Sequence, residues 1–199
     1  VPFHMWVPDV YQGSPTSVTM FLSTVPKIAA VALLVRLLID GLSDFQHYWA
    51  DLFMILAVLS IGVGSLVALT QTNIKRMLAY STISHIGFVL LGFVTGVLEG
   101  YGSAVFYVFA YILMSLAAFG SIIVLNRSGY EADQISDFRG LSKHSPWFAL
   151  IMLVVMLSMA GVPPFIGFYS KLFILQQVVS EGYVILAVIA VIFAVISAY

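Results

Sequence analysis

Long apolar runs, separated by short polar or glycine- and proline-containing segments, make up most of the chain. A bilayer core of about 30 Å is crossed by about 20 apolar residues in a helix, so runs of this length predict membrane-spanning helices. The expected spans cover residues 15–39, 52–70, 78–98, 104–125 and 147–179, followed by an incomplete span at 183–199. The pattern predicts an all-α fold, with one polytopic transmembrane helix bundle over residues 1–199.

Prolines are expected to interrupt two of these spans. Gly161-Val162-Pro163-Pro164 divides residues 147–179, because each proline removes a backbone donor and restricts the residue before it. A broken helix in a membrane is tolerated only where protein or water satisfies the freed backbone groups, so the break is a functional hint. We expect one discontinuous crossing here, with a hairpin of two short helices as the alternative. Pro26 is expected to interrupt the first span.

The ends of the chain and its basic residues bear on processing and orientation. The chain begins at Val1 without an initiator Met, a basic segment or a cleavage-site pattern, so we expect no signal peptide. We expect both ends to be cut from a longer chain. Basic residues favour the cytoplasmic side of a membrane. One side would carry Lys75, Arg76, Arg127, Arg139 and Lys143 and the other only Arg36, so the first side is expected to be cytoplasmic, or its organellar equivalent.

Composition narrows the classes of function. Hydrophobic residues make up 61% of the 199 residues and charged residues 9%, which places the chain in lipid. A net charge of −1 without a basic stripe argues against nucleic-acid binding. Without cysteine the chain cannot ligate an iron–sulfur cluster through thiolates, and it has no phosphate loop, HExxH metal site or nucleophile–base set. We expect no cofactor or metal bound by this chain, and the chemistry available is proton transfer.

Two lysines fall inside expected spans, where a charge costs roughly 2.5–3.5 kcal/mol. Lys27 lies near the middle of its span, too far from either end to reach water, and Lys171 follows the expected break. Both are therefore candidate proton carriers. A structural ion pair for Lys27 and interfacial anchoring for Lys171 remain the alternatives. No carboxylate lies within an expected span, so a charged partner would have to come from outside this chain.

A hydroxyl-rich strip at residues 80–85 ends in His85, whose ring can accept and donate a proton near neutral pH. We interpret His85 as a third relay candidate, with Tyr80 and Ser81 able to extend it. Ordinary hydrogen bonding within a helix is the alternative.

Two further features are candidate links in a proton path. Tyr107, Tyr111 and Ser115 recur every four residues and share one face of their helix, where they could hold water or pack against a neighbour. Lys75 stands beside Arg76 at a helix terminus, where anchoring at the interface is favoured over a link between half-channels.

Three separated motifs resemble the antiporter-like subunits of respiratory complex I. They read PFHMWVPDVYQGSP at residues 2–15, LTQTNIKRMLAYSTISHIG at residues 69–87 and GVPPFIGFYSK at residues 161–171. Within that family they resemble the branch called subunit N. The resemblance covers essentially the whole chain. It implies an inverted-repeat antiporter-like fold. It also implies that this chain is a fragment of a fourteen-helix subunit, from the end of the seventh helix to the start of the thirteenth.

The resemblance also implies roles and partners. Lys27 matches the family's central lysine and Lys171 the lysine of the broken twelfth helix, whereas the family's glutamate and first lysine would precede Val1. The family's histidines on the eleventh helix have no match, since Tyr107 and Tyr111 stand in that span. NAD, FMN, iron–sulfur clusters and quinone are expected in partner subunits.

The resulting hypothesis is a proton-translocating membrane subunit of NADH:quinone oxidoreductase, driven by electron transfer in other membrane and peripheral subunits. Lys27 would be the central relay, His85 with water the link, and Lys171 the terminal donor toward the far side. The expected location is an energy-conserving membrane, the bacterial inner membrane above all. A cation/proton antiporter subunit of the same fold and a non-conducting structural subunit remain the alternatives.

Overall fold

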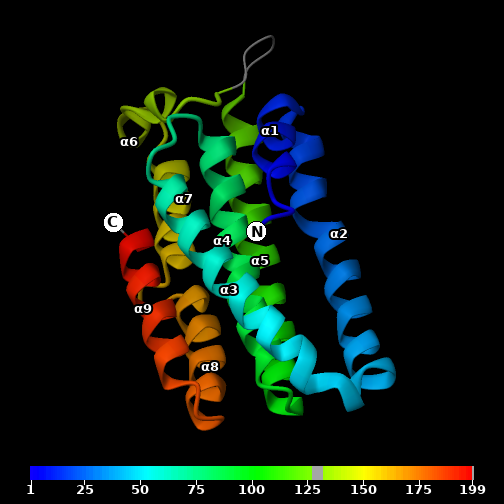
Figure 1. Cartoon of the computed structure of the whole chain (residues 1–199). Helices are drawn as coiled ribbons and strands as arrows, with labels where there is room; N and C mark the ends of the chain where they lie inside the picture. Colours follow the sequence, from blue (N-terminus) through cyan, green and yellow to red (C-terminus); the bar gives the residue numbers. More distant parts are fainter. Residues whose placement is uncertain (127–131, 199) are drawn as a thin grey trace.

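The computed structural model describes residues 1–126 and 132–198, which form helices joined by short turns (Figure 1). In chain order these are α1 (Trp6–Gly13), α2 (Thr16–Arg36), α3 (Gln46–Ala68), α4 (Ile74–Val94), α5 (Leu98–Leu125), α6 (Leu141–His144), α7 (Pro146–Ala160), α8 (Ile166–Ser180) and α9 (Val184–Ala198). A π-helical turn (Leu37–Gly41) continues α2, and short 3-10 turns occupy Ser43–Phe45 and Ile135–Phe138. The predicted all-α bundle is confirmed.

Four helical segments of the described chain are long and apolar enough to cross a membrane, namely Thr16–Gly41, Ser43–Ala68, Ile74–Val94 and Leu98–Leu125. Helices α3 and α5 begin before the apolar runs expected at residues 52 and 104 and include the exposed Asp51 and Glu99. Hydropathy marks the part of a helix that lies in hydrocarbon, and a helix can continue where its polar side chains are hydrated. The acidic residues therefore lie at helix ends and not in the interior.

Helix α4 lies at the centre of the bundle, where α1, α3, α5 and α8 all pack against it. It has the lowest mean hydropathy of the four long segments, 1.7, and the largest buried share, 72%. The polar side chains that lower its hydropathy thus face protein, since lipid would leave them without partners. The candidate site is built around this helix.

Close helix contacts at small residues explain this central position. A Cβ added at Gly64 of α3 would lie 2.8 Å from the Tyr80 carbonyl oxygen, and one at Gly87 of α4 would lie 3.0 Å from that of Ala57. Gly92 approaches Ala104 of α5 in the same way, with 2.9 Å between the added Cβ and the alanine Cβ. Small residues allow this approach and bring the polar faces of α3, α4 and α5 together.

The two proline sites behave differently. Helix α7 ends at Ala160 and is followed by the cap residue Gly161, whose φ of +89° suits glycine, and α8 starts at Ile166 beyond Pro163 and Pro164. The two helices follow one another along the bundle (Figure 1). Pro26, by contrast, lies inside an uninterrupted α2, so its expected interruption is wrong. A single proline removes one hydrogen bond, and the remaining turns of a long helix hold it together.

Candidate functional site

Lys27 meets hydroxyls from two helices and aromatic rings from α1 and α5. Its Nζ donates to the Tyr111 hydroxyl of α5 over 2.8 Å and to the Thr82 hydroxyl of α4 over 3.4 Å, and these two hydroxyls lie 2.6 Å apart. The ammonium also lies 4.5 Å from the centre of the Tyr111 ring and 5.7 Å from that of Tyr11. Hydroxyl oxygens and the faces of two aromatic rings therefore surround the charge.

The surrounding elements hold this cluster in place. Thr82 donates to the Leu78 carbonyl one turn earlier in α4, and Tyr111 lies buried on the inner face of α5. Tyr11 reaches the cluster from α1, with its ring edge-on to that of Phe119. The short helix α1 is thus part of the site, and the sequence patterns did not single out Tyr11 or Thr82.

Lys171 has a different kind of partner. Its Nζ donates to the carbonyl oxygens of Ala160 and Met159 over 2.7 Å and 3.2 Å, and the Phe88 ring centre lies 5.4 Å away. These carbonyls are at the C-terminal end of α7, where a helix has unpaired acceptors and a partial negative charge. The break in the helix therefore supplies the acceptors that hold this lysine.

No Asp or Glu is buried among the described residues. The expectation that a charged partner of the two lysines would come from outside this chain stays a prediction. Backbone carbonyls at Lys171 and hydroxyls at Lys27 satisfy the ammonium groups within this chain. A sequence pattern does not reveal backbone acceptors, because every residue has one.

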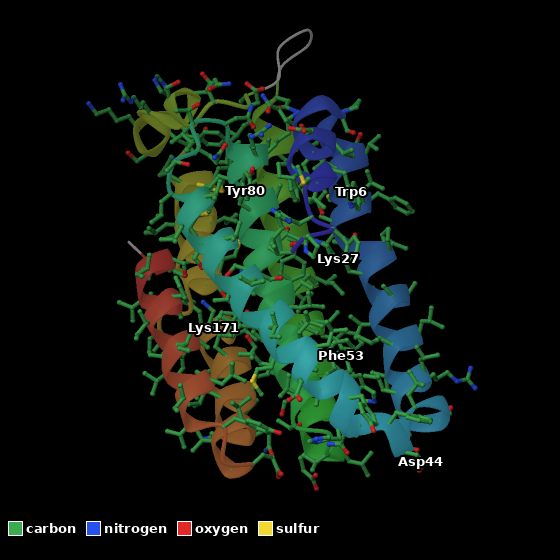
Figure 2. The ribbon with its side chains drawn as sticks, in the orientation of Figure 1. Trp6, Lys27, Asp44, Phe53, Tyr80 and Lys171 are labelled. Atoms are coloured by element: carbon green, nitrogen blue, oxygen red, sulfur yellow. The ribbon has the colours of Figure 1, made fainter. Side chains whose placement is uncertain are left out.

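His85 lies between these two groups on α4. Its Nδ1 is 2.7 Å from the Tyr107 hydroxyl, and its ring centre is 5.2 Å from that of Tyr111, the partner of Lys27. On its other side it lines a cavity of about 350 Å³ together with Lys171. His85 is 4% exposed, so the protein interior surrounds it. The structure thus brings His85, Tyr107, Tyr111 and both lysines into one region of the bundle, and Figure 2 places the two lysines in its middle part.

The remaining sequence candidates lie in different surroundings. Ser81 lines the cavity that contains Lys171, whereas Tyr80 is half-buried near the start of α4. Lys75 is buried, and its Nζ donates to the Ser14 carbonyl at the end of α1 over 3.1 Å. Lys75 therefore joins the ends of α1 and α4 and does not enter the Lys27 cluster. Ser115 is buried, and its hydroxyl has no hydrogen-bond partner in the described part of the chain.

This arrangement can hold protons and exchange them. Lysine amines, an imidazole and tyrosine hydroxyls can each accept and donate a proton, and they recur along the centre of the bundle. In the part of the chain that the structure describes, no group of three or more His, Cys, Asp or Glu side chains could hold a metal ion. The chemistry that the geometry supports is proton transfer.

Comparisons with known proteins agree with this chemistry. A family model described as "NADH:quinone oxidoreductase/Mrp antiporter, TM" matches residues 1–197. The NADH-quinone oxidoreductase subunit N of Ruthia magnifica subsp. Calyptogena magnifica is 72% identical over 199 residues, which are 100% of this chain and 41% of that protein. The chain therefore spans about two fifths of the length of this curated relative.

Solved structures give the same fold. A chain of respiratory complex I from Thermus thermophilus matches with a TM-score of 0.83 and 36% identity, over 100% of this chain and 43% of that one. A chain of the Mrp complex from a Dietzia species matches with a TM-score of 0.87 and 26% identity, over 100% of this chain and 37% of that one. The antiporter-like fold expected from the motifs is confirmed.

Proposed function

Since this chain belongs to the family of NADH:quinone oxidoreductase and Mrp antiporter membrane subunits, we propose that it forms part of a proton-translocating subunit of NADH:quinone oxidoreductase. Lys27 is the central relay, and His85 links it to Lys171 through water. The redox chemistry belongs to partner subunits, where NAD, FMN, iron–sulfur clusters and quinone are expected. The enzyme is thus a translocase, and this chain supplies a proton path and no redox centre.

One observation carries the proposal: polar contacts run from Lys27 through Tyr111 and Thr82, and His85 stands between this cluster and the cavity of Lys171. Titratable groups inside a membrane are costly and are found mostly on ion and proton pathways. Ser115 supports the same view, because a buried hydroxyl without a protein partner is commonly satisfied by ordered water. We therefore expect water beside the tyrosines of α5.

The neutral partners of Lys27 favour a relay over a structural ion pair. A buried carboxylate would hold the lysine permanently charged, whereas hydroxyls can donate to a neutral amine as well as accept from an ammonium. Lys27 can thus keep hydrogen bonds in both protonation states. This property is what a proton carrier requires.

The proposed location is an energy-conserving membrane, specifically the bacterial inner membrane. The long apolar helices require a lipid environment, and the relatives named above are bacterial. The partners are the other membrane subunits of the complex. The proposed orientation places the ends that carry Lys75, Arg76, Arg139 and Lys143 on the cytoplasmic side. Arg127, also used for this expectation, lies outside the described residues.

The decisive experiment compares Lys27→Ala and Lys27→Arg in the whole complex, reconstituted in vesicles. Arginine keeps the charge and can donate to Tyr111, but it does not release its proton in a protein. We expect both variants to lose NADH-driven proton pumping while the complex still assembles. Lys143→Ala, at an exposed position of α6, is the control and should pump normally. Normal pumping by Lys27→Arg would show that a fixed charge suffices, and the relay assignment would fail.

A second candidate is a cation/proton antiporter subunit, which the match to the Mrp complex favours. It shares the fold and the lysines but works without NADH. Transport that depends on sodium and does not change when NADH is added would support it over the proposal. If both Lys27→Ala and Lys171→Ala left transport normal, the chain would be a non-conducting structural subunit.

A further inference from the structure

The short helix α1 lies at one end of the bundle (Figure 1). It has 8 residues, and no side chain caps its start. A helix of this length is not stable on its own, so its position depends on contacts with its neighbours. Thr19 of α2 donates its hydroxyl to the Tyr11 carbonyl over 3.1 Å, and α4 packs against α1. The neighbouring helices therefore decide where α1 stands.

Two consecutive basic residues in the first turn of α4 hold α1. Arg76 Nη1 donates to the Asp9 carboxylate over 2.7 Å and to the Gln12 amide oxygen over 3.0 Å. The buried Lys75 donates to the carbonyl of Ser14, the residue that caps the end of α1, over 3.1 Å. Asp9 belongs to the first turn of α1. The contacts thus extend along α1 from its first turn to its C-terminal cap.

The first turn of α4 is itself fixed in place. The side-chain oxygen of Asn73 accepts from the Arg76 backbone N–H over 3.1 Å, which is the usual contact of a helix N-cap. The amide nitrogen of Asn73 donates to the Asp133 carboxylate over 2.9 Å, and Asn73 is buried. The Arg76 side chain therefore starts from a backbone that cannot shift freely, and it holds α1 against a fixed point.

The opposite side of α1 carries Tyr11 into the candidate site. Tyr11 is 1% exposed, and its ring lies edge-on to Phe119 and 5.7 Å from the Lys27 Nζ. The side chains of Arg76 and Asp9 are 31% and 71% exposed. Residues two positions apart in a helix do not face the same way, so Asp9 can contact Arg76 while Tyr11 points inward. A shift of α1 would move the Tyr11 ring relative to Lys27.

We propose that Arg76 is a positioning residue, which holds α1 through Asp9 and Gln12 so that the Tyr11 ring stays beside the Lys27 ammonium. An aromatic ring attracts a cation at this distance, so the ring stabilises charged Lys27 without taking its proton. An exposed ion pair contributes little to stability, but this one determines where a short helix lies. The inference rests on the proposed function, because it concerns the same relay lysine.

The test measures NADH-driven proton pumping per assembled complex, in vesicles, for Arg76→Ala, for Tyr11→Leu and for both changes together. Leucine keeps an apolar side chain but removes the ring. We expect each single variant to pump about two- to fivefold more slowly, which is the factor that a cation–π contact of modest strength supplies. The double variant should pump at the rate of Tyr11→Leu, because Arg76 acts through the ring. Arg36→Ala, an exposed arginine at the end of α2, is the matched control and should pump normally.

An exchange of charges tests whether the ion pair itself is responsible. Arg76→Asp places two carboxylates opposite each other, and the addition of Asp9→Arg restores a pair of opposite charges. We expect Arg76→Asp to pump more slowly than Arg76→Ala, and the exchanged pair to recover most of the lost pumping. A loss of structure alone would lower the amount of assembled complex and leave pumping per assembled complex unchanged.

Normal pumping by either Arg76→Ala or Tyr11→Leu would overturn the inference. A double variant slower than Tyr11→Leu would also overturn it, since Arg76 would then act independently of the ring, and so would an exchanged pair that recovers nothing. The relay assignment is decided separately by Lys27→Arg. Loss of pumping in Lys27→Arg together with normal pumping in Arg76→Ala would leave the proposed function standing and remove only the positioning role.

Discussion

At the scale of single residues, the two lysines are stabilised by neutral groups of different kinds. A lysine in the bilayer centre costs roughly 2.5–3.5 kcal/mol, and a hydrogen bond to a charged group contributes about 1.5–3 kcal/mol. Two bonds from each ammonium, to hydroxyls at Lys27 and to carbonyls at Lys171, are therefore of the size needed to offset the cost. Neither lysine has a carboxylate that would fix its proton, since none is buried in the described residues.

Removal of the Tyr111 hydroxyl tests this balance at Lys27. Tyr111→Phe keeps the ring beside the ammonium but deletes the 2.8 Å bond and leaves Thr82 as the hydroxyl partner. Loss of a hydrogen bond that contributes about 1.5–3 kcal/mol should weaken the cluster that holds Lys27 and slow pumping by about tenfold or more. Tyr101→Phe, on the same helix, is the control, because the residues that the structure describes make no hydrogen bond to its hydroxyl. Equal pumping rates of the two variants, measured in vesicles at constant NADH oxidation, would contradict the expectation.

At the scale of helices, the apolar runs and the Pro163-Pro164 pair were enough to predict the bundle and the presence of a break. The contacts made at the break could not be predicted. Lys171 binds carbonyls of α7, which have no sequence signature, and Gly161 allows its side chain to pass. Pro26 was misread for a related reason, because a proline in a sequence does not show whether the rest of its helix is long enough to continue.

Gly161→Ala tests the role of the break. An alanine at φ +89° costs roughly 1–2 kcal/mol, and its Cβ would also lie 3.0 Å from Lys171 Nζ. We expect the displaced ammonium to lose its bond to Ala160 and pumping to fall, with most of the complex still assembled. Gly182→Ala is a matched control, because it has a similar φ of +86° but open space around the added Cβ. Similar pumping by both variants at equal complex content would mean that backbone strain alone, and not the displaced Lys171, explains the effect.

At the scale of the whole molecule, α4 separates two polar regions and contributes to both. Thr82 faces the Lys27 cluster, whereas Ser81 and Ser84 face the cavity of Lys171. The four-residue spacing of Tyr107 and Tyr111 predicted one shared face of their helix, and both are buried in α5, but their partners lie on other helices. Such pairings depend on helix packing, which here is set by glycines such as Gly64 whose neighbours a single sequence does not reveal.

This division makes His85 the residue on which transfer between the two regions depends. His85→Gln keeps a side chain that can hydrogen-bond to Tyr107, but an amide does not take up a proton near neutral pH. We expect the variant to assemble, to retain the Lys27 cluster and to lose coupled pumping. His47→Gln, at an exposed position in the first turn of α3, should behave as the unmodified protein. If His85→Gln still pumped at the normal rate while Lys27→Arg did not, protons would pass Lys27 without crossing α4 at His85, and the Lys171 cavity would have to work as a separate path.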